Sequence, residues 1–559
     1  MKLKGGRAAS GLSGFANGSV LTLAAVIIAV FIAAPVLSVF SNVFVGGTGE
    51  TWAHLSDTVL GDFVFNTVVL CLGVGLGVAS IGITTAWLTT MLDFPGRRFY
   101  EWALVLPMAM PAYVMAYAYT DFLQFVGPVQ SGLRAFFGWR AGDYWFPDVR
   151  TVGGAVTMFM FVLYPYCYIL VRTAFLERAG GMLEAGRSLG LGPWGCFLHV
   201  SLPLARPAVV AGTALALMET LADFGTVSYF GVQTFTTGIY RAWFSLGDRI
   251  AAAQLAAALL TFVVLVLSLE FASRGRARFN NTSRQQGAPA RRNLPLGLGL
   301  LASFACFMPL LLGFLLPAAL LLHMAFVDGD AQFGPRFVHL ARNSFVLAAL
   351  TSVIAVGLAV LLAYAARLAR SSLPAAMNRI VGLGYAVPGS VIAVGVLIPV
   401  TRLDTWLVQV WQASFGVNPG LILSGGIAAL VYAYLARFLA VALNAVESSL
   451  GKITASMDDA ARSLGCGKWE TLRRVHVPIL RGSLLSAALL VFVDVMKELP
   501  ATLVIRPFNF DTLATQAHTL AADERLAEAS TAALIIVAVG LLPMFVISRQ
   551  ILKGGRRQD

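Results

Sequence analysis

Long apolar runs separated by short polar segments make up most of the chain. The first run extends from about Val20 to Phe44 and is long enough for a helix that crosses a bilayer, which needs roughly 20 residues. It is too long for the core of a cleaved signal peptide. Similar runs follow at about residues 64–90, 101–125, 151–175, 206–230, 250–272, 296–326, 343–367, 377–402, 421–446, 481–505 and 527–549. The pattern predicts an all-α membrane protein with about 12 transmembrane helices in two sets of six.

The composition agrees with a membrane protein. Of the 559 residues, 58% are hydrophobic and only 12% are charged, whereas soluble domains carry about 25% charged residues. The net charge of +12 would suggest a nucleic-acid partner in a soluble protein, but here the basic residues lie in the predicted loops. The five cysteines are scattered without metal-ligand spacing, so no resident metal is expected.

One polar segment between two apolar runs occurs twice. Residues 184–203 read EAGRSLGLGPWGCFLHVSLP, and residues 459–478 read DAARSLGCGKWETLRRVHVP. Nine of the 20 positions are identical at an offset of 275 residues. Gly190 and Pro193 should end one short helix, and a second short helix is expected to start at Trp194 and end before Pro203. Each copy therefore predicts two short helices that meet at a glycine corner, which suits a docking surface for a partner outside the membrane.

Both copies resemble the cytoplasmic loop of bacterial binding-protein-dependent ABC importer permeases. The family pattern is E-A-A-x3-G-x9-I-x-L-P, and this chain differs from it by conservative replacements such as Gly186, Asp459 and Val200. The resemblance implies that the loops dock onto the ATPase subunit, and we name them docking loop 1 and docking loop 2. The positions that it assigns to docking are Glu184, Ala185, Gly190, Trp194 and Pro203 in loop 1, and Asp459, Ala460, Gly465, Trp469 and Pro478 in loop 2. An ordinary amphipathic membrane loop is the plainer alternative.

The resemblance also implies a fold and a set of partners. The expected fold is that of type I importer permeases, with two parallel six-helix repeats. The expected partners are a cytoplasmic ATPase homodimer, a periplasmic substrate-binding protein and the lipid bilayer, with one permease chain per complex and no nucleic acid. The chain has no G-x4-G-K-[ST] motif, so ATP and Mg²⁺ are expected on the ATPase and no cofactor on this chain.

The distribution of basic residues predicts the orientation. Arginines and lysines gather in the loops on the side of both docking loops, and acidic residues such as Glu50 and Asp328 lie on the other side. The positive-inside rule puts both termini and both docking loops in the cytoplasm, with the chain in the bacterial inner membrane. The predicted segments are 1–63 (first span), 64–272 (repeat 1), 273–295 (basic linker), 296–342 (seventh span and periplasmic loop), 343–549 (repeat 2) and 550–559 (tail).

Acidic residues interrupt the fifth apolar run of each half. Glu219 and Asp223 are four residues apart and would share one helix face. Asp494 and Glu498 repeat this spacing, with Lys497 beside the second. Because charges inside a membrane usually face a protein interior or a water-filled cavity, these five residues are candidates for a translocation pathway that suits a hard cation. The alternative is a set of buried polar residues satisfied by neighbouring helices, including an ion pair between Lys497 and a carboxylate.

The segments around these acids resemble the fused, two-repeat permeases of ferric-iron importers. The resemblance rests on residues 219–227, 494–502 and 506–515 and implies Fe³⁺ as the substrate. Thiamine or another small cation stays open, because related fused permeases carry it. A secondary transporter driven by an ion gradient is the alternative from another class, although such a carrier would need no ATPase dock.

Overall fold

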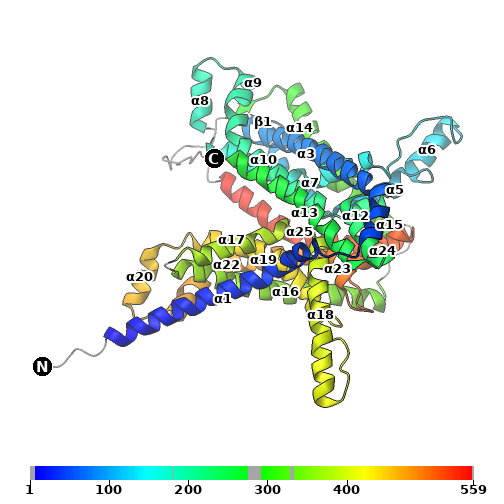
Figure 1. The fold of residues 1–559 in the computed structure, drawn as a ribbon. Coiled ribbons are helices and arrows are strands. Elements are labelled where there is room, and N and C mark those ends of the chain that lie inside the picture. Colours follow the sequence, from blue (N-terminus) through cyan, green and yellow to red (C-terminus); the bar gives the residue numbers. More distant parts are fainter. Residues whose placement is uncertain (1–6, 179, 275–290, 328–332, 370, 557–559) are drawn as a thin grey trace. The chain divides into compact units, whose positions relative to one another are not determined.

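The computed structural model describes residues 7–178, 180–274, 291–327, 333–369 and 371–556 (Figure 1). The described chain is almost entirely helical, as expected. Its one described sheet is a parallel pair of two-residue strands, β1 (Leu92–Asp93) and β2 (Arg292–Asn293), in which Leu92 faces Arg292. Eleven described helices are long and apolar enough to cross a membrane, or up to 12 if the bent pair Arg97–Ala109 and Ala112–Phe137 is one span. The predicted all-α membrane fold is confirmed.

The chain forms two compact units, and neither is continuous in sequence. Unit 1 contains Met1–Val45 and Leu340–Thr512, and unit 2 contains Gly46–His339 and Leu513–Asp559. The first span thus belongs to the unit formed mainly by the second half of the chain. The seventh span and the last span belong to the unit formed mainly by the first half.

Unit 1 is organised around α19, which packs against α1, α17, α18 and α22. Most of the side chains of α19 are buried, which explains its nearly continuous apolar sequence. The elements of this unit are α1 (Arg7–Asn42), α16 (Pro335–Leu368, which begins in unit 2), α17 (Leu373–Gly382), η5 (Leu383–Ala386), α18 (Gly389–Phe415), α19 (Ala428–Leu450), α20 (Ala455–Ser463), α21 (Lys468–Thr471), η6 (Leu472–His476), α22 (Val477–Met496) and α23 (Pro500–Ile505).

Unit 2 is organised around α7, which packs against α3 and α10. The first elements of this unit are α2 (Gly49–Thr58), α3 (Leu60–Met91), β1, α4 (Arg97–Ala103), η1 (Leu106–Ala109), α5 (Ala112–Leu123), α6 (Pro128–Phe137), α7 (Val152–Arg178), α8 (Gly180–Ser188), α9 (Pro193–Cys196), η2 (Phe197–Ser201), α10 (Leu202–Ala222) and α11 (Gly225–Tyr229). The others are α12 (Phe235–Tyr240), η3 (Arg241–Ser245), α13 (Arg249–Arg274), β2, α14 (Leu296–Leu310), η4 (Leu311–Leu315), α15 (Leu316–Phe326), α24 (Leu513–Ala522) and α25 (Leu526–Arg556).

Prolines break the third span of each half. Pro111 and Pro388 have extended backbones and directly precede α5 and α18. Because proline lacks an N–H and its ring disfavours a helical residue before it, the third span of each half is completely broken at this proline. In unit 2 the two helices on either side of the break are bent by 91°.

The repeat in the sequence reappears as matching contacts within each unit. Asn66 in unit 2 donates its side-chain amide to the carbonyl of Gln233 at 2.9 Å. Its counterpart in unit 1, Asn343, donates to the carbonyl of Asp511 at 3.1 Å. In both cases the asparagine ties the second span of a half to the segment that follows the fifth, so each asparagine has the same structural role.

Candidate functional site

Docking loop 1 turns at Gly190. The helix α8 ends just before this glycine, whose φ is 83°. The Gly190 N–H donates to the carbonyl of Arg187, and the Leu191 N–H donates to the carbonyl of Gly186, both at 3.0 Å. This pair of bonds is the Schellman motif, which uses a left-handed glycine to satisfy the last carbonyls of a helix.

Docking loop 2 turns in the same way at Gly465. Its φ is 85°. The Gly465 N–H donates to the carbonyl of Arg462, and the Cys466 N–H donates to the carbonyl of Ala461, again both at 3.0 Å. The predicted glycine corner is therefore present in both copies. A side chain at either glycine would force a backbone conformation that L-residues rarely adopt.

The second helix of each docking loop does not end at the proline, contrary to the prediction. In loop 1, α9 continues through the π turn η2 into α10, so residues Trp194–Ala222 form one continuous candidate span. Loop 2 does the same through η6 into α22. Pro203 and Pro478 lie just after the π turns, at the second residue of α10 and α22. The wider hydrogen-bond spacing of a π turn accommodates a residue without an N–H inside a continuous helix, so each docking loop is continuous with the fifth span.

Each docking loop exposes a leucine and a tryptophan. Leu189 and Trp194 are 83% and 74% exposed in loop 1, and Leu464 and Trp469 are 85% and 58% exposed in loop 2. The acid-alanine pairs Glu184–Ala185 and Asp459–Ala460 are also exposed. Large apolar side chains that are exposed at the same place in two copies are typical of a protein-binding surface.

Polar contacts hold docking loop 2 against its own unit. Asp458, one residue before the loop, lies 2.6 Å from Nε2 of His476 and accepts from Nε of Arg367 at 3.0 Å. Arg367 also donates to the carbonyls of Leu450 and Ile453, each at 2.9 Å. Partial burial raises the pKa of Asp458, but the hydrogen bonds from His476 and Arg367 outweigh it and hold this pKa below its ordinary value. The carboxylate thus links the end of α16, the end of α19 and the start of α22.

Aromatic contacts occupy the same place in docking loop 1. Trp87 of α3 packs against Phe197 of η2 with ring centroids 4.8 Å apart, and against Phe175 of α7 at 5.6 Å. Phe197 also contacts Trp194 at 5.8 Å. At an offset of 275 residues, Ser201 stands where loop 2 has His476. The two docking loops therefore share a backbone shape but are attached by different chemistry.

The acidic pair of unit 2 does not share one helix face, contrary to the prediction. Glu219 lies on α10 and is partly buried. The helix ends at Ala222, and Asp223 has an extended backbone. The Asp223 carboxylate accepts from the N–H groups of Thr226 and Val227 at 2.8 and 3.3 Å, which makes it the N-cap of the short helix α11.

The acidic pair of unit 1 is divided in the same way. Asp494 lies on α22 and forms an ion pair with Nζ of Lys497 at 2.9 Å. Glu498 lies beyond the end of α22 and caps α23, since it accepts from the N–H groups of Ala501 and Thr502 at 2.9 and 3.1 Å. Its Oε1 is also 3.5 Å from Nη1 of the buried Arg437 on α19.

Arg437 is the residue that sequence reasoning missed. It is the one basic residue in the apolar run 428–446, and a lone arginine in a predicted span signals a buried acidic partner. With Lys497 and Arg437, unit 1 offsets the charges of both its acids, as the alternative interpretation of satisfied polar residues expected. Among the described residues, no group of three or more histidines, cysteines, aspartates or glutamates is placed to hold a metal ion.

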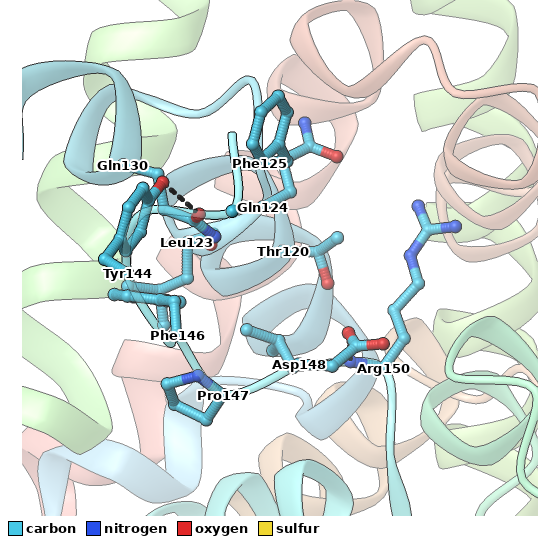
Figure 2. Close-up of a pocket in the computed structure, with 12 residues that line it drawn as sticks. Thr120, Leu123, Gln124, Phe125, Gln130, Tyr144, Phe146, Pro147, Asp148 and Arg150 are labelled. Atoms are coloured by element: carbon cyan, nitrogen blue, oxygen red, sulfur yellow. Dashed lines mark hydrogen bonds between the residues drawn. The ribbon is translucent and has the colours of Figure 1, made fainter. Parts of the chain in front are cut away.

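A pocket lies at the far end of unit 2 from docking loop 1. It encloses about 380 Å³ between the end of α5, α6 and the segment that precedes α7 (Figure 2). Thr120, Gln124, Asp148 and Arg150 contribute polar side chains, and Tyr144 closes one side by donating to Gln130 at 2.8 Å. None of the predicted site residues lines this pocket.

Comparisons with known proteins give one family. The model of the binding-protein-dependent transport system inner membrane component matches residues 78–274. The Fe(3+)-transport system permease protein FbpB 2 of Haemophilus influenzae is 25% identical over 539 residues, which cover 95% of this chain and 98% of that protein. The molybdenum transport system permease protein ModB of Escherichia coli is 30% identical over 197 residues, which cover 34% of this chain and 81% of ModB.

A solved bacterial alginate ABC transporter, in complex with an alginate-bound periplasmic protein, aligns with 45% of this chain at 14% identity and a TM-score of 0.35, which is too low to carry an argument. The sequence relatives and the helical fold agree with each other. The chain belongs to the family of binding-protein-dependent transport system inner membrane components, as a multi-pass permease with two repeats.

Proposed function

We propose that this chain is the whole membrane-spanning part of an ATP-driven importer, and that a cytoplasmic ATPase homodimer binds docking loops 1 and 2. The observation that carries the proposal is the duplicated glycine corner with an exposed leucine and tryptophan in each copy. A homodimer offers two equal binding surfaces, and one chain with two such loops supplies a matching ligand for each.

The continuous helices suggest how movement is transmitted. Because α9 and α21 run through π turns into α10 and α22, a displacement of either docking loop would move the fifth span of the same unit. Closure of the ATPase on ATP would then switch the spans between inward-open and outward-open states. ATP and Mg²⁺ stay on the ATPase, and this chain needs no cofactor.

The proposal includes a substrate-binding protein on the opposite side of the membrane. We place both termini and both docking loops in the cytoplasm and the chain in the bacterial inner membrane, as the distribution of basic residues favours. A periplasmic binding protein would then deliver the substrate to the end of unit 2 at which α6 and the pocket lie, away from docking loop 1 (Figure 1).

Ferric iron is the proposed substrate. Support comes from the relative named as an Fe(3+)-transport permease, which aligns over 95% of this chain. The intramembrane acids add less support than expected, because Lys497 and Arg437 offset the acids of unit 1. We propose that Glu219 and Asp223 line the part of the pathway that unit 2 provides. Thiamine or another small cation is the alternative substrate.

A binding experiment tests the docking role directly. The chain is purified in detergent with a candidate partner ATPase, and the amount of bound ATPase is compared with that bound by Leu189→Asp, Leu464→Asp and the double variant. Each single variant should lose part of the ATPase and the double variant nearly all. Phe508→Asp is the matched control, since Phe508 is 94% exposed but lies beyond the other end of α22.

Uptake into proteoliposomes tests the rest of the proposal. Iron uptake should require ATP inside the vesicles together with the ATPase, the binding protein outside and both docking loops. ATPase binding that survives the double variant would overturn the docking role. Uptake driven by an ion gradient without ATPase would instead support a secondary transporter.

A further inference from the structure

A hairpin made of one helix and an irregular returning segment projects from unit 1, at the end of the unit opposite docking loop 2. The hairpin, which we name the arm, comprises residues 402–427, that is, the second half of α18 and the segment that returns to α19. The first ten residues of α18 are buried, whereas most of the arm is exposed. In Figure 1 this half of α18 extends well beyond the other helices of the unit.

Hydrogen bonds within the arm hold its two segments together. Asp404, which is fully buried, accepts hydrogen bonds from the N–H groups of Ile422, Leu423 and Ser424 at 2.8, 3.1 and 3.0 Å. The hydroxyl of Ser424 donates to the same carboxylate at 2.6 Å. At the tip, Gly416 ends α18 in the left-handed conformation with a φ of 69°. The acidic group of the arm thus closes the hairpin, and its charge does not face outward.

The exposed surface of the arm is mainly apolar. Its one exposed charged residue is Arg402, at the base of the arm, and no acidic or basic residue occurs from Thr405 to Ala436. The large exposed side chains are Leu403, Trp406, Val410, Trp411, Phe415, Val417, Leu421 and Ile422. Two uncharged glutamines lie beside the tryptophans: Gln409 is between Trp406 and Trp411, and Gln412 is between Trp411 and the tip. Tryptophan beside uncharged polar residues is typical of the boundary between lipid and water, where the ring is buried and its N–H stays hydrated.

The attachment of the arm places it at that boundary. Gly395 of α18 lies directly on the carbonyl of Pro35 of α1, where a larger residue would collide. At the other end of the arm, the Tyr432 hydroxyl donates to the carbonyl of Phe31 at 2.6 Å. Pro35 lies seven residues before the end of α1, which is roughly 10 Å along a helix. The arm therefore leaves the unit near one end of a membrane span.

The direction of α18 determines which part of the bilayer surrounds the arm. In Figure 1, α18 runs across the direction of α1, α19 and α22, which are candidate membrane spans of this unit. By length and composition α18 is also a candidate span, so its direction relative to the other helices decides between the two placements. A helix that crosses membrane spans near their ends must lie close to the plane of the membrane. Its neighbours there are the phospholipid headgroups and the first methylenes of the acyl chains.

We propose that the arm lies in the lipid–water interface of the membrane face opposite docking loop 2 and anchors unit 1 to the bilayer there. The partner of the arm is phospholipid, and because residues 405–427 carry no charge, zwitterionic lipid is sufficient. A soluble protein that docks and leaves would meet a surface with charged groups around its rim, whereas the one exposed charge of the arm, Arg402, lies at its base. The inference needs only that the chain spans a membrane and is independent of ATP and of substrate.

The matching segment of unit 2 supports the same inference, because it also exposes aromatic side chains. There α6 and the residues that follow it form a second hairpin between the third and fourth spans, after the 91° bend. It exposes Phe136 and Trp145, which are 83% and 86% exposed. Arg134 is turned back over the ring of Phe125, 4.1 Å from its centroid. Both halves of the chain thus present aromatic side chains on a lateral hairpin at the same point of the repeat.

Spin-label accessibility tests the proposal on the full chain. The five cysteines are replaced, Val410→Cys is labelled, and the protein is placed in nanodiscs of phosphatidylcholine alone. The label should collide more often with oxygen, which dissolves in lipid, than with a water-soluble nickel chelate. Two reference sites in the same background calibrate the ratio, namely Val30→Cys on the lipid-facing side of α1 and Leu189→Cys in docking loop 1.

The expected ratio lies between those of the Val30 and Leu189 sites and does not change when anionic lipid is added, because Val30 is near the middle of the span Val20–Asn42. A ratio equal to that of the Val30 site would mean that α18 crosses the membrane and would also overturn the proposal. Trp406→Asp combined with Trp411→Asp, which leaves the Asp404 closure intact, should shift the ratio toward that of the Leu189 site. Three other results overturn the proposal: a ratio like that of the Leu189 site in the unaltered arm, a label that only the substrate-binding protein shields, or a label that neither reagent reaches.

Discussion

Two glycines fix the shape of the docking loops at the scale of single residues. Gly190 and Gly465 both adopt a left-handed conformation, and a Cβ at either position would meet nothing within 4 Å. The requirement for glycine is therefore one of backbone conformation and not of space. Gly192 and Gly467 lie two residues further on, also have open space, and have no positive φ. The chain thus supplies its own control for each corner.

Replacing the corner glycine should weaken each docking loop. Gly190→Ala and Gly465→Ala should each cost about 1–2 kcal/mol, which is the penalty of the left-handed conformation for an L-residue. Hydrogen exchange of residues 184–203 and 459–478 should speed up, and less substrate should be transported per ATP hydrolysed. Gly192→Ala and Gly467→Ala should leave both measurements unchanged. Equal effects of all four variants would contradict this role of the corner.

The two capping acids differ in their partners, so they should respond differently to loss of charge. Glu498→Gln breaks the contact with the buried Arg437 and should lower the stability by roughly 3 kcal/mol, as is usual when one member of a buried ion pair is removed. Asp223→Asn keeps an N-cap acceptor for α11 and should cost less than about 1 kcal/mol.

Thermal unfolding in detergent measures both effects. Combining Glu498→Gln with Arg437→Met should recover part of the loss, because both charges of the buried pair are then removed. If Asp223→Asn abolishes iron uptake while keeping full stability, the charge of Asp223 acts on the substrate. If its uptake is normal, Asp223 is only a cap.

At the scale of elements, the sequence predicts the spans better than the places where they break. Apolar runs located most of the spans to within a few residues because burial in lipid requires continuous apolar sequence. Three predicted spans, 206–230, 377–402 and 481–505, are displaced by 8 to 13 residues from Trp194–Ala222, Gly389–Phe415 and Lys468–Met496. Asp223 and Glu498 were placed on a helix face because their spacing fits a helix, yet each sits just beyond a helix end and caps the next helix. Spacing alone cannot distinguish these arrangements, since the decisive partners are backbone N–H groups.

The ends of the docking helices show the opposite error. Pro203 and Pro478 suggested helix ends, but each lies inside a continuous helix, where the π turn before it accommodates the missing N–H. These π turns have no sequence signal at single-residue level. The glycine corners were predicted correctly because the left-handed residue that ends a helix is most often glycine.

Docking loop 2 should loosen in acid before docking loop 1 does. The hydrogen bonds to Asp458 hold its pKa below the ordinary value, so their stabilisation is complete above the ordinary pKa of about 3.9. It is lost as the pH falls through the lowered pKa. Hydrogen exchange, corrected for its intrinsic pH dependence, should therefore show faster exchange in residues 455–476 below about pH 4. Residues 184–201, held by the rings of Trp87 and Phe197, should show no such step.

Asp458→Asn separates this carboxylate from general acid unfolding. The variant should show loosened exchange in loop 2 at neutral pH, and the acid-induced step should disappear. A step of the same size in the variant would mean that another group is responsible.

At the scale of the whole molecule, sequence order and spatial grouping differ. Unit 2 is assembled from residues on both sides of the basic linker. Gly313 of η4 lies against the carbonyl of Phe161, and Gly540 of α25 lies against Ala109. The parallel pair β1 and β2 joins the same two parts of the chain. A comparison of the two repeats in sequence does not show that the seventh and last spans belong to unit 2, because it aligns each repeat only with the other repeat.

The chain should therefore survive division at the linker. Residues 1–274 and 291–559, produced together as separate polypeptides with a tag on the first, should co-purify in detergent. Gly313→Leu combined with Gly540→Leu should reduce the recovery of the second fragment, since both side chains would collide with the first fragment. Gly297→Leu is the control, because a Cβ there meets nothing within 4 Å. Fragments that separate without any substitution would contradict this assembly.

The unequal fastening of the two docking loops has a mechanical consequence. An ATPase homodimer presents identical surfaces, yet one would push on a segment tethered by an aspartate and an arginine and the other on a segment lodged among aromatic rings. The same movement of the two ATPase subunits would then act on two docking loops that resist displacement to different extents. We expect the two nucleotide sites of the assembled transporter to turn over at different rates, although the two ATPase polypeptides have the same sequence.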